Sequence, residues 1–268
     1  MLLTMIKHYV KRIASDYIML LVYILLPTGL LALNMIVNNA NVEGTEHIYN
    51  GFDMIASVVV MNLLVMFQIF SSSTIIDYLH SDINGERRWR LLAAPATLGS
   101  YIFAATVAAI LFSMISGAIL LLVGYFVFNA YMFNLLIVIG IMFILSLMAQ
   151  IFGMFLFMFF KKKSTTEAII LVSGFAMTIA AGGFLGEINF GVQVVTTFFQ
   201  EYTPFALGFR AILHTGNFPV SENFFSGFYN FGMSQNNLTY ALRNLCILTA
   251  ITAVMGVIVA VIARRRPL

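Results

Sequence analysis

The densest group of reactive side chains in this sequence is a short charged stretch between two long apolar ones. It contains Glu86, Arg87, Arg88 and Arg90 and is followed by Pro95. The stretch suits a short helix that Pro95 ends, because proline lacks the backbone N–H that would continue the helix. Held at a membrane surface, such a helix could transmit a rigid displacement into the flanking segments. Alternatively, its arginines face anionic lipid headgroups and only orient the chain.

A second group of polar residues lies inside the apolar stretches. Asn62, Gln68 and Gln150 are neutral amides, and we interpret them as hydrogen-bonding groups between helices rather than as ligands. The hydroxyls of Ser71–Thr74 are expected to bond back to helical carbonyls about one turn earlier. In the six spans defined below, Arg243 is the one charged residue. Secondary carriers and proton pumps usually bury charge at membrane depth. The sequence therefore favours a transporter that is driven from elsewhere and has an amphipathic or apolar substrate.

Motifs for bond-making chemistry are absent from the sequence. There is no Gly-x-x-x-x-Gly-Lys-Ser/Thr loop, so we do not expect this chain to bind ATP itself. His8, His47, His80 and His214 show no metal-binding spacing, and Cys246 is the single cysteine. No Gly-x-Ser-x-Gly turn is present either. We expect neither enzymatic activity nor a cofactor or metal in this chain.

The elements that carry these residues follow from composition. Of the 268 residues, 61% are hydrophobic and 9% are charged, whereas soluble domains have roughly 25% charged residues. A membrane-spanning helix needs about 20 apolar residues. The sequence thus predicts an all-α polytopic membrane protein, with one transmembrane domain over residues 1–268. Six spans are expected, and the first is predicted to be retained rather than cleaved as a signal peptide. They are Tyr17–Val37, Met54–Ile76, Ile102–Phe128, Asn134–Phe160, Ala168–Leu185 and Tyr240–Ile262.

Positive charges predict the orientation of these spans. Four clusters of three basic residues hold 12 of the 14, and all four fall on one side, which the positive-inside rule makes cytoplasmic. Both termini are then cytoplasmic in a multi-pass protein of the cell membrane. Because every cluster flanks a span, lipid rather than nucleic acid is the expected anionic partner. The clusters are Lys7, Lys11, Arg12; Arg87, Arg88, Arg90; Lys161, Lys162, Lys163; and Arg264, Arg265, Arg266.

Shorter helices are expected outside the spans. In residues 1–16, Leu2, Ile6, Tyr9 and Ile13 share one helical face, which indicates an interfacial amphipathic helix. Between the fifth and sixth spans, residues 188–200 and 204–215 are apolar enough to form short helices in the outer leaflet. At that depth lipid offers no hydrogen bonds, so the backbone must be helical or covered by protein.

Two stretches resemble the membrane subunits of ABC exporters, specifically the ABC type-2 permeases. Glu86-Arg-Arg-Trp-Arg-Leu-Leu-Ala-Ala-Pro95 resembles the family's cytoplasmic segment, which ends in a Leu-Leu-Ala-x-Pro-like turn. Thr203-Pro-Phe-Ala-Leu-Gly-Phe-Arg210-Ala-Ile-Leu-His-Thr-Gly216 resembles its outer Pro…Arg-Ala-Leu-Leu…Gly segment. The layout is also similar over nearly the whole chain, from the interfacial helix to the long outer segment after the fifth span.

This resemblance implies a function and a set of partners. It assigns Glu86, Arg87, Arg88 and Arg90 to a coupling helix between spans two and three, which docks on separate ABC ATPase subunits that hold ATP and Mg. It implies a second permease chain, the same or related, with spans one, two and five along the central interface. The function implied is export of an amphipathic compound, such as a drug, an antimicrobial peptide or a lipid-like molecule. The conduit candidates are then Asn62, Met66, Phe70, Phe175 and Met177.

Two other functions fit the same residues. One is a membrane sensor or resistance module that binds a membrane-active peptide without moving it. The other is a channel or carrier that works without ATP.

Overall fold

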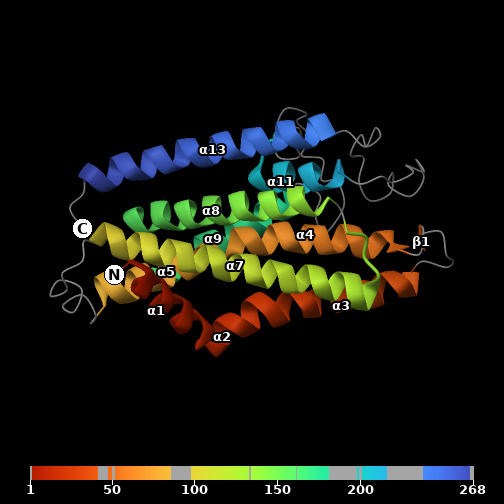
Figure 1. Ribbon diagram of the computed structural model, residues 1–268, viewed down its shortest axis with the longest axis horizontal. Coiled ribbons are helices and arrows are strands. Elements are labelled where there is room, and N and C mark those ends of the chain that lie inside the picture. Colours follow the sequence, from red (N-terminus) through yellow and green to blue (C-terminus); the bar gives the residue numbers. More distant parts are fainter. Residues whose placement is uncertain are drawn as a thin grey trace.

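Long apolar helices running side by side form the chain in the computed structural model (Figure 1). The structure describes residues 2–41, 48–49, 52–85, 98–132, 134–160, 162–180, 198, 201–215 and 238–265. The helices are α1 (Leu2–Ala14), α2 (Tyr17–Leu20), η1 (Leu21–Leu25), α3 (Leu26–Asn41), α4 (Met54–Phe70), α5 (Ser72–Leu79), η2 (His80–Asn84), α7 (Leu98–Phe128), α8 (Leu135–Phe159), α9 (Lys163–Ala180), α11 (Pro204–Leu213) and α13 (Leu238–Arg265). A small antiparallel hairpin joins β1 (Ile48–Tyr49) to β2 (Phe52–Asp53) before α4.

Five helical segments are long and apolar enough to cross a membrane. They are Tyr17–Val37, Met54–Ile83, Gly99–Phe128, Leu135–Phe159 and Leu238–Ile262. Their bounds match five of the expected spans to within a few residues at most ends, and the second runs seven residues further than expected. The chain therefore has the helices of an all-α membrane protein.

The expected fifth span, Ala168–Leu185, falls on α9. This helix has 18 described residues, and its first turns carry Lys163 and Glu167, which lower its mean hydropathy. The expected residues beyond Ala180 lie outside the described part of the chain, so a sixth span stays a prediction.

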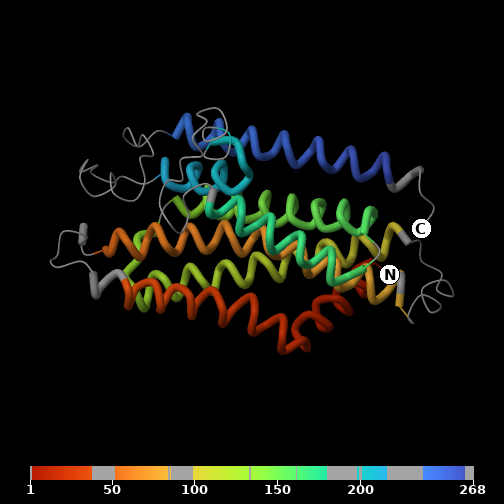
Figure 2. Tube along the Cα trace, turned by 180° about the vertical axis from the view of Figure 1, so that it is seen from behind, coloured from red at the N-terminus to blue at the C-terminus, as the bar shows by residue number. Residues whose placement is uncertain are grey.

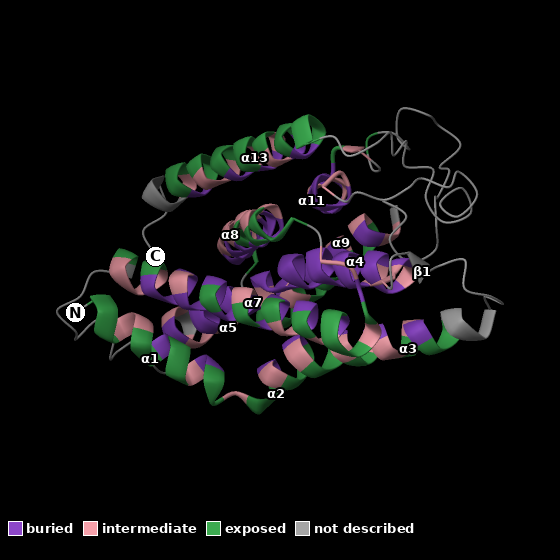
Figure 3. Cartoon of the chain, turned by 45° about the vertical axis from the view of Figure 1, so that its right-hand side comes forward, coloured by how far each residue is buried: buried purple, intermediate pink, exposed green. Residues whose placement is uncertain are grey.

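Helix α4 lies at the centre of the bundle. All of its residues except Ile55 and Val59 are buried, and it packs against α3, α7, α8, α9 and α11 (Figure 3). The helices around it keep an apolar outer face. On α13, for example, Val254 and Val257 are more than half exposed. Apolar side chains on the outside of such a bundle are suited to lipid contact.

Helix α1 lies obliquely against the bundle rather than along it (Figures 1 and 2). Its apolar face meets α7, and Tyr9 and Ile13 are buried there. Ile6 is half-buried, whereas Leu2 is 42% exposed. The apolar face that the sequence predicts is confirmed, but most of it packs on protein. At Ser15 the chain turns into the first span, and the side chain of Asp16 caps α2 by accepting from the amide of Ile18 (3.1 Å).

One end of the bundle gathers the start of α1, the segment α5–η2, the start of α9 and the end of α13 (Figures 1 and 2). We call it the basic end, because Lys7, Lys11 and Arg12 lie on α1, and Lys162 and Lys163 lie at the start of α9. Helix α11 and the β1–β2 hairpin lie towards the opposite end. The described positive clusters thus share one end, as the sequence predicts.

Candidate functional site

A charged cluster joins α1 to the last turn of the second span. Asp82, in η2, is 7% exposed and accepts hydrogen bonds from the hydroxyl of Tyr9 (2.8 Å) and from Nη1 of Arg12 (2.9 and 3.0 Å to its two oxygens). Nη2 of Arg12 donates to the hydroxyl of Ser81 (2.6 Å). The guanidinium of Arg12 also lies 4.6 Å from the centre of the Tyr78 ring. Arg12 is therefore held by charge, hydrogen bonds and a cation–π contact together.

Two buried tyrosines, Tyr9 and Tyr78, pack together in this cluster. The rings of Tyr9 and Tyr78 are 5.5 Å apart. Burial and the adjacent Asp82 carboxylate raise the pKa of Tyr9 well above its ordinary value, so its hydroxyl stays a donor. Burying a carboxylate is costly unless it is paired and hydrogen-bonded. The cluster meets this condition, and it fixes α1 against η2 across about seventy residues of sequence.

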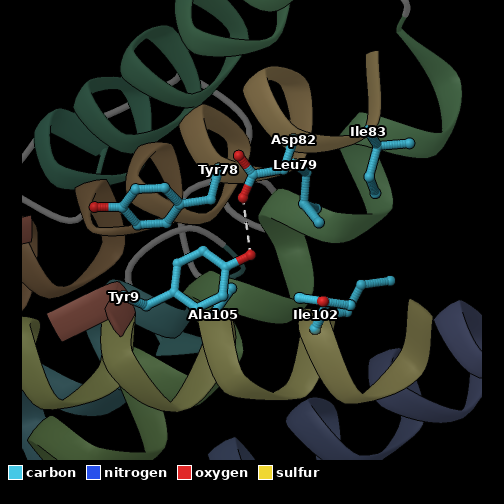
Figure 4. Close-up of a pocket in the computed structure, with 8 residues that line it drawn as sticks. Tyr9, Tyr78, Leu79, Asp82, Ile83, Ile102 and Ala105 are labelled. Carbon is cyan, nitrogen blue, oxygen red and sulfur yellow. Dashed lines mark hydrogen bonds between the residues drawn. The ribbon is translucent and has the colours of Figure 1, made fainter. Parts of the chain in front are cut away.

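A small pocket opens beside the cluster (Figure 4). In this view the Tyr9 hydroxyl points at Asp82, and apolar side chains from α5, η2 and α7 close the other sides. Its walls are almost entirely apolar. The lining residues are Tyr9, Tyr78, Leu79, Asp82, Ile83, Tyr101, Ile102 and Ala105.

A second ion-paired group ties α5 to α9. Lys163 bonds to Asp77 of α5 and lies 3.7 Å from Glu167 one turn further along α9. Burial lowers the pKa of Lys163, but the hydrogen bond and charge of Asp77 outweigh it and raise the pKa above its ordinary value. Burial raises the pKa of Glu167 against the opposing charge of Lys163. The segment α5–η2 is thus fastened on two sides, to α1 and to α9.

The predicted coupling residues follow this fastened segment directly. Glu86, Arg87, Arg88 and Arg90 lie outside the described residues, as does the expected short helix that contains them. Asp82 stands four positions before Glu86 in the chain. The structure therefore describes the residues that lead into the predicted coupling segment. The contacts of Glu86, Arg87, Arg88 and Arg90 stay a prediction.

Two of the three amides inside the spans, Gln68 and Gln150, bond between helices, as predicted. Oε1 of Gln68 on α4 accepts from the hydroxyls of Ser113 (2.5 Å) on α7 and Ser146 (2.8 Å) on α8. Nε2 of Gln68 donates to the carbonyl of Ser113 (3.0 Å). Gln150 on α8 donates to the carbonyl of Ser71 (3.1 Å). All of these side chains are buried, so the bonds specify which helices meet and in what register.

The structure brings only some of the conduit candidates together. Asn62, Met66 and Phe70 are buried on α4, surrounded by helices of the same chain. The rings of Phe70 and Phe175 are in contact, with centres 5.0 Å apart and planes tilted by 58°, and Phe175 is 44% exposed on α9. Met177 is half-buried on α9 and packs against the core. Phe70 and Phe175 thus form a continuous contact from the core to the outer surface.

Sequence reasoning missed the charged cluster. It assigned Arg12 to topology and treated Tyr9 as part of an apolar face. The available signal was Asp82, an acid near the predicted cytoplasmic end of a span, where it needs a cationic partner. Which of the nearby basic residues supplies that partner depends on the tilt of α1, and the sequence does not encode that tilt locally.

Metal ligation has no counterpart within the described ranges, where no three His, Cys, Asp or Glu side chains group around a possible ion. Comparisons with known proteins give no family: no protein-family model and no curated protein matches this chain.

Proposed function

We propose that this chain is the membrane-spanning subunit of an exporter of amphipathic substrates, powered by a separate ATPase subunit that binds ATP and Mg. The observation that carries the proposal is the fastening of α5–η2 to α1 through Arg12–Asp82 and to α9 through Lys163–Asp77. This segment leads into the charged stretch at Glu86. A displacement of that stretch would be transmitted to the first and fifth predicted spans as well as to the second. A coupling helix must transmit its displacement to the spans in this way.

Two further features support the proposal. The described spans carry amides and hydroxyls at mid-depth, bonded between helices. The buried carboxylate of Asp82 lies at the basic end rather than at mid-depth, which favours a transporter powered by another subunit. The described positive clusters gather at the end where α5–η2 emerges. A cytoplasmic ATPase would meet that end if the positive-inside rule holds.

We further propose that α9 is the fifth of six spans and that two permease chains, the same or related, form the pathway. The outward contact of Phe70 and Phe175 supports this arrangement. The exposed ring of Phe175 on α9 lies next to the buried ring of Phe70. A facing chain or an apolar substrate could contact α9 there.

The test is purification of the chain from its native membrane, followed by identification of its partners. We expect an ABC ATPase to copurify and to hydrolyse ATP. Glu86→Ala, or reversal of Arg87 and Arg88 to Glu, should then lower the ATPase rate of the complex while the protein still inserts. Lys162→Ala is the matched control, because Lys162 is an exposed basic residue at the same end; this variant should keep the rate.

Three outcomes would contradict the proposal. No ATPase copurifies; the Glu86 and arginine variants keep full activity; or purified chain in vesicles gives solute flux without ATP, which would identify a channel or carrier. Binding of a membrane-active peptide without vectorial uptake would instead identify a sensor.

A further inference from the structure

The apolar segment Met54–Ile83 is interrupted at Ser71, just past its middle. Helix α4 ends at Phe70 and α5 begins at Ser72. The amide of Thr74 bonds to the carbonyl of Ser71 three residues back (3.1 Å), not four as in an α-helix. The hydroxyls of Ser71 and Ser72 also bond back to carbonyls three residues earlier (2.6 and 3.0 Å). Such back-bonding bends helices.

Side chains from two other helices donate hydrogen bonds to the backbone carbonyls at this break. The hydroxyl of Tyr23 donates to the carbonyl of Phe70 (2.8 Å) and also bonds to the hydroxyl of Ser73. Nε2 of Gln150 donates to the carbonyl of Ser71 (3.1 Å) and to its hydroxyl oxygen (3.1 Å). Tyr23 and Gln150 are buried. Inserted side chains are a recognised cause of helix kinks, and at membrane depth they replace the water that is missing there.

Tyr23 itself comes from a widened helical turn. In η1 the amide of Leu26 bonds to the carbonyl of Leu21, five residues back. Single turns of this kind are often found at functional sites. Two irregular turns, one in the first span and one in the second, therefore meet through a single hydroxyl.

Helix α8 is shaped to lie against the break. A Cβ at Gly153 would lie 2.7 Å from the carbonyl oxygen of Ser72 and 2.6 Å from Cγ2 of Ile75. No side chain fits there, so the backbone of α8 rests almost directly on the backbone of the broken span. Gln150, one turn earlier on α8, supplies the hydrogen bond at the same place.

The two segments on either side of the break both pack against α7, α8 and α9, but their hydrogen-bonded and ionic partners differ. Helix α4 is bonded to α7 and α8 through Gln68. Segment α5–η2 is bonded to α1 through Asp82 and to α9 through Asp77. Ion pairs therefore connect α5–η2 to its neighbours, whereas buried hydrogen bonds between neutral groups connect α4 to its neighbours.

From this arrangement we propose that Ser71–Ser73 is a pivot. The segment α5–η2 rotates about this pivot together with α1 and the start of α9, while α4 stays in place. The close backbone contact at Gly153 of α8 is the point about which it rotates. The inference rests on the proposed function for the source of the motion, since the ATPase subunit would move α5–η2. The pivot itself belongs to this chain and can be tested without the ATPase.

The first test is hydrogen–deuterium exchange on the full chain in lipid nanodiscs. Amides of residues 72–75 should exchange faster than those of residues 62–65. Gln150→Leu should raise exchange at 72–75 about fivefold, the factor that corresponds to one hydrogen bond of about 1 kcal/mol. Gln68→Leu is the matched control: it removes a buried amide of the same size three residues before the break, and it should leave exchange at 72–75 within a factor of two. Equal exchange in the two ranges, or equal effects of the two variants, would overturn the pivot.

The second test measures the motion in the complex with its copurified ATPase. Cys246 is the only cysteine, so a Cys246→Ala background allows paired spin labels. Lys11→Cys with Val261→Cys reports the basic end, and Val127→Cys with Leu242→Cys reports the opposite end; all four positions are exposed. Trapping with Mg-ATP and vanadate should shift the first distance beyond the width of its resting distribution and leave the second unchanged.

Two results would overturn the proposal: a shift of both distances, which means that the span moves as one rigid rod, or a shift of neither while the complex hydrolyses ATP. Failure of the proposed function is a separate result, because in that case no ATPase copurifies and the exchange measurement still decides whether the span has a pivot.

Discussion

The contact between Arg12 and Asp82 makes the most direct prediction about stability. We consider Arg12→Ala, Asp82→Ala and the double variant. The side chains of Arg12 and Asp82 are 23% and 10% exposed, so the pair is mostly but not fully withdrawn from water. Removing one partner of a fully buried pair costs about 3–5 kcal/mol. Because the hydroxyls of Tyr9 (2.8 Å) and Ser81 (3.4 Å) still donate to the carboxylate, we expect Arg12→Ala to cost about 2–3 kcal/mol.

The double variant separates pairing from burial. Asp82→Ala should cost about 2 kcal/mol, since the partly exposed Arg12 can turn to water. If the two groups interact, the double variant should cost about 3 kcal/mol, which leaves a coupling energy of about 1–2 kcal/mol. The assay is reversible unfolding of the purified chain in mixed micelles, followed by helical circular dichroism.

Lys7→Ala serves as the control, because Lys7 is exposed on the same helix and should change stability by less than about 0.5 kcal/mol. Costs of Arg12→Ala and Asp82→Ala that add to within about 0.5 kcal/mol in the double variant would refute the reasoning, since non-interacting sites behave that way.

Three further predictions concern other parts of the chain. Gly153→Ala should destabilise the fold by about 2 kcal/mol or more through overlap with a carbonyl of the broken span, whereas Gly140→Ala on the same helix meets nothing within 4 Å and should be neutral or slightly stabilising in the same unfolding assay. Burial, together with two nearby arginines, lowers the pKa of His214 below its ordinary 6.5, so the folded state binds fewer protons than the unfolded state. Stability should therefore fall as the pH drops below about 6.5, and His214→Gln should remove that part of the pH dependence. In a Cys-free background, Lys162→Cys should react with an impermeant maleimide only in inside-out vesicles, and Asn129→Cys only in right-side-out ones; the reverse pattern would refute the predicted orientation.

Five long apolar helices could be read from the sequence because apolar run length is a local property. The start of α8 illustrates this: Asn134 was expected to begin the fourth span, and its side chain caps that helix by accepting from the amide of Ile137 (3.5 Å). The interhelical role of Gln68 and Gln150 could also be predicted, because a buried amide must find a partner. Both inferences require only the residue and its immediate surroundings.

The partners themselves could not be predicted. Tyr23 and Phe70 are 47 residues apart, and Arg12 and Asp82 are 70 apart. Their contacts depend on helix tilt and register, which many weak packing contacts set together. Of the hydroxyls at Ser71–Thr74, those of Ser71 and Ser72 bond back to the helix as expected, whereas that of Ser73 bonds to Tyr23. Nothing local in the sequence indicates that a tyrosine from another span completes the turn. An apolar face is likewise ambiguous: that of α1 would suit lipid or protein equally, and it packs on α7.

The hydrogen bonds at the break also bear on how the protein is assembled. Synthesis runs from the N-terminus, so Tyr23 enters the membrane before the break, whereas Gln150 follows Ser71 by 79 residues. The carbonyl of Phe70 thus has its partner as soon as two spans are present. The carbonyl of Ser71 gains its side-chain partner only when α8 docks, and that docking needs the smooth face at Gly153. A chain stalled before α8 would keep the bond from the Thr74 amide to Ser71 but would lack the second bond from Gln150 and the contact at Gly153, so the break would be held less firmly.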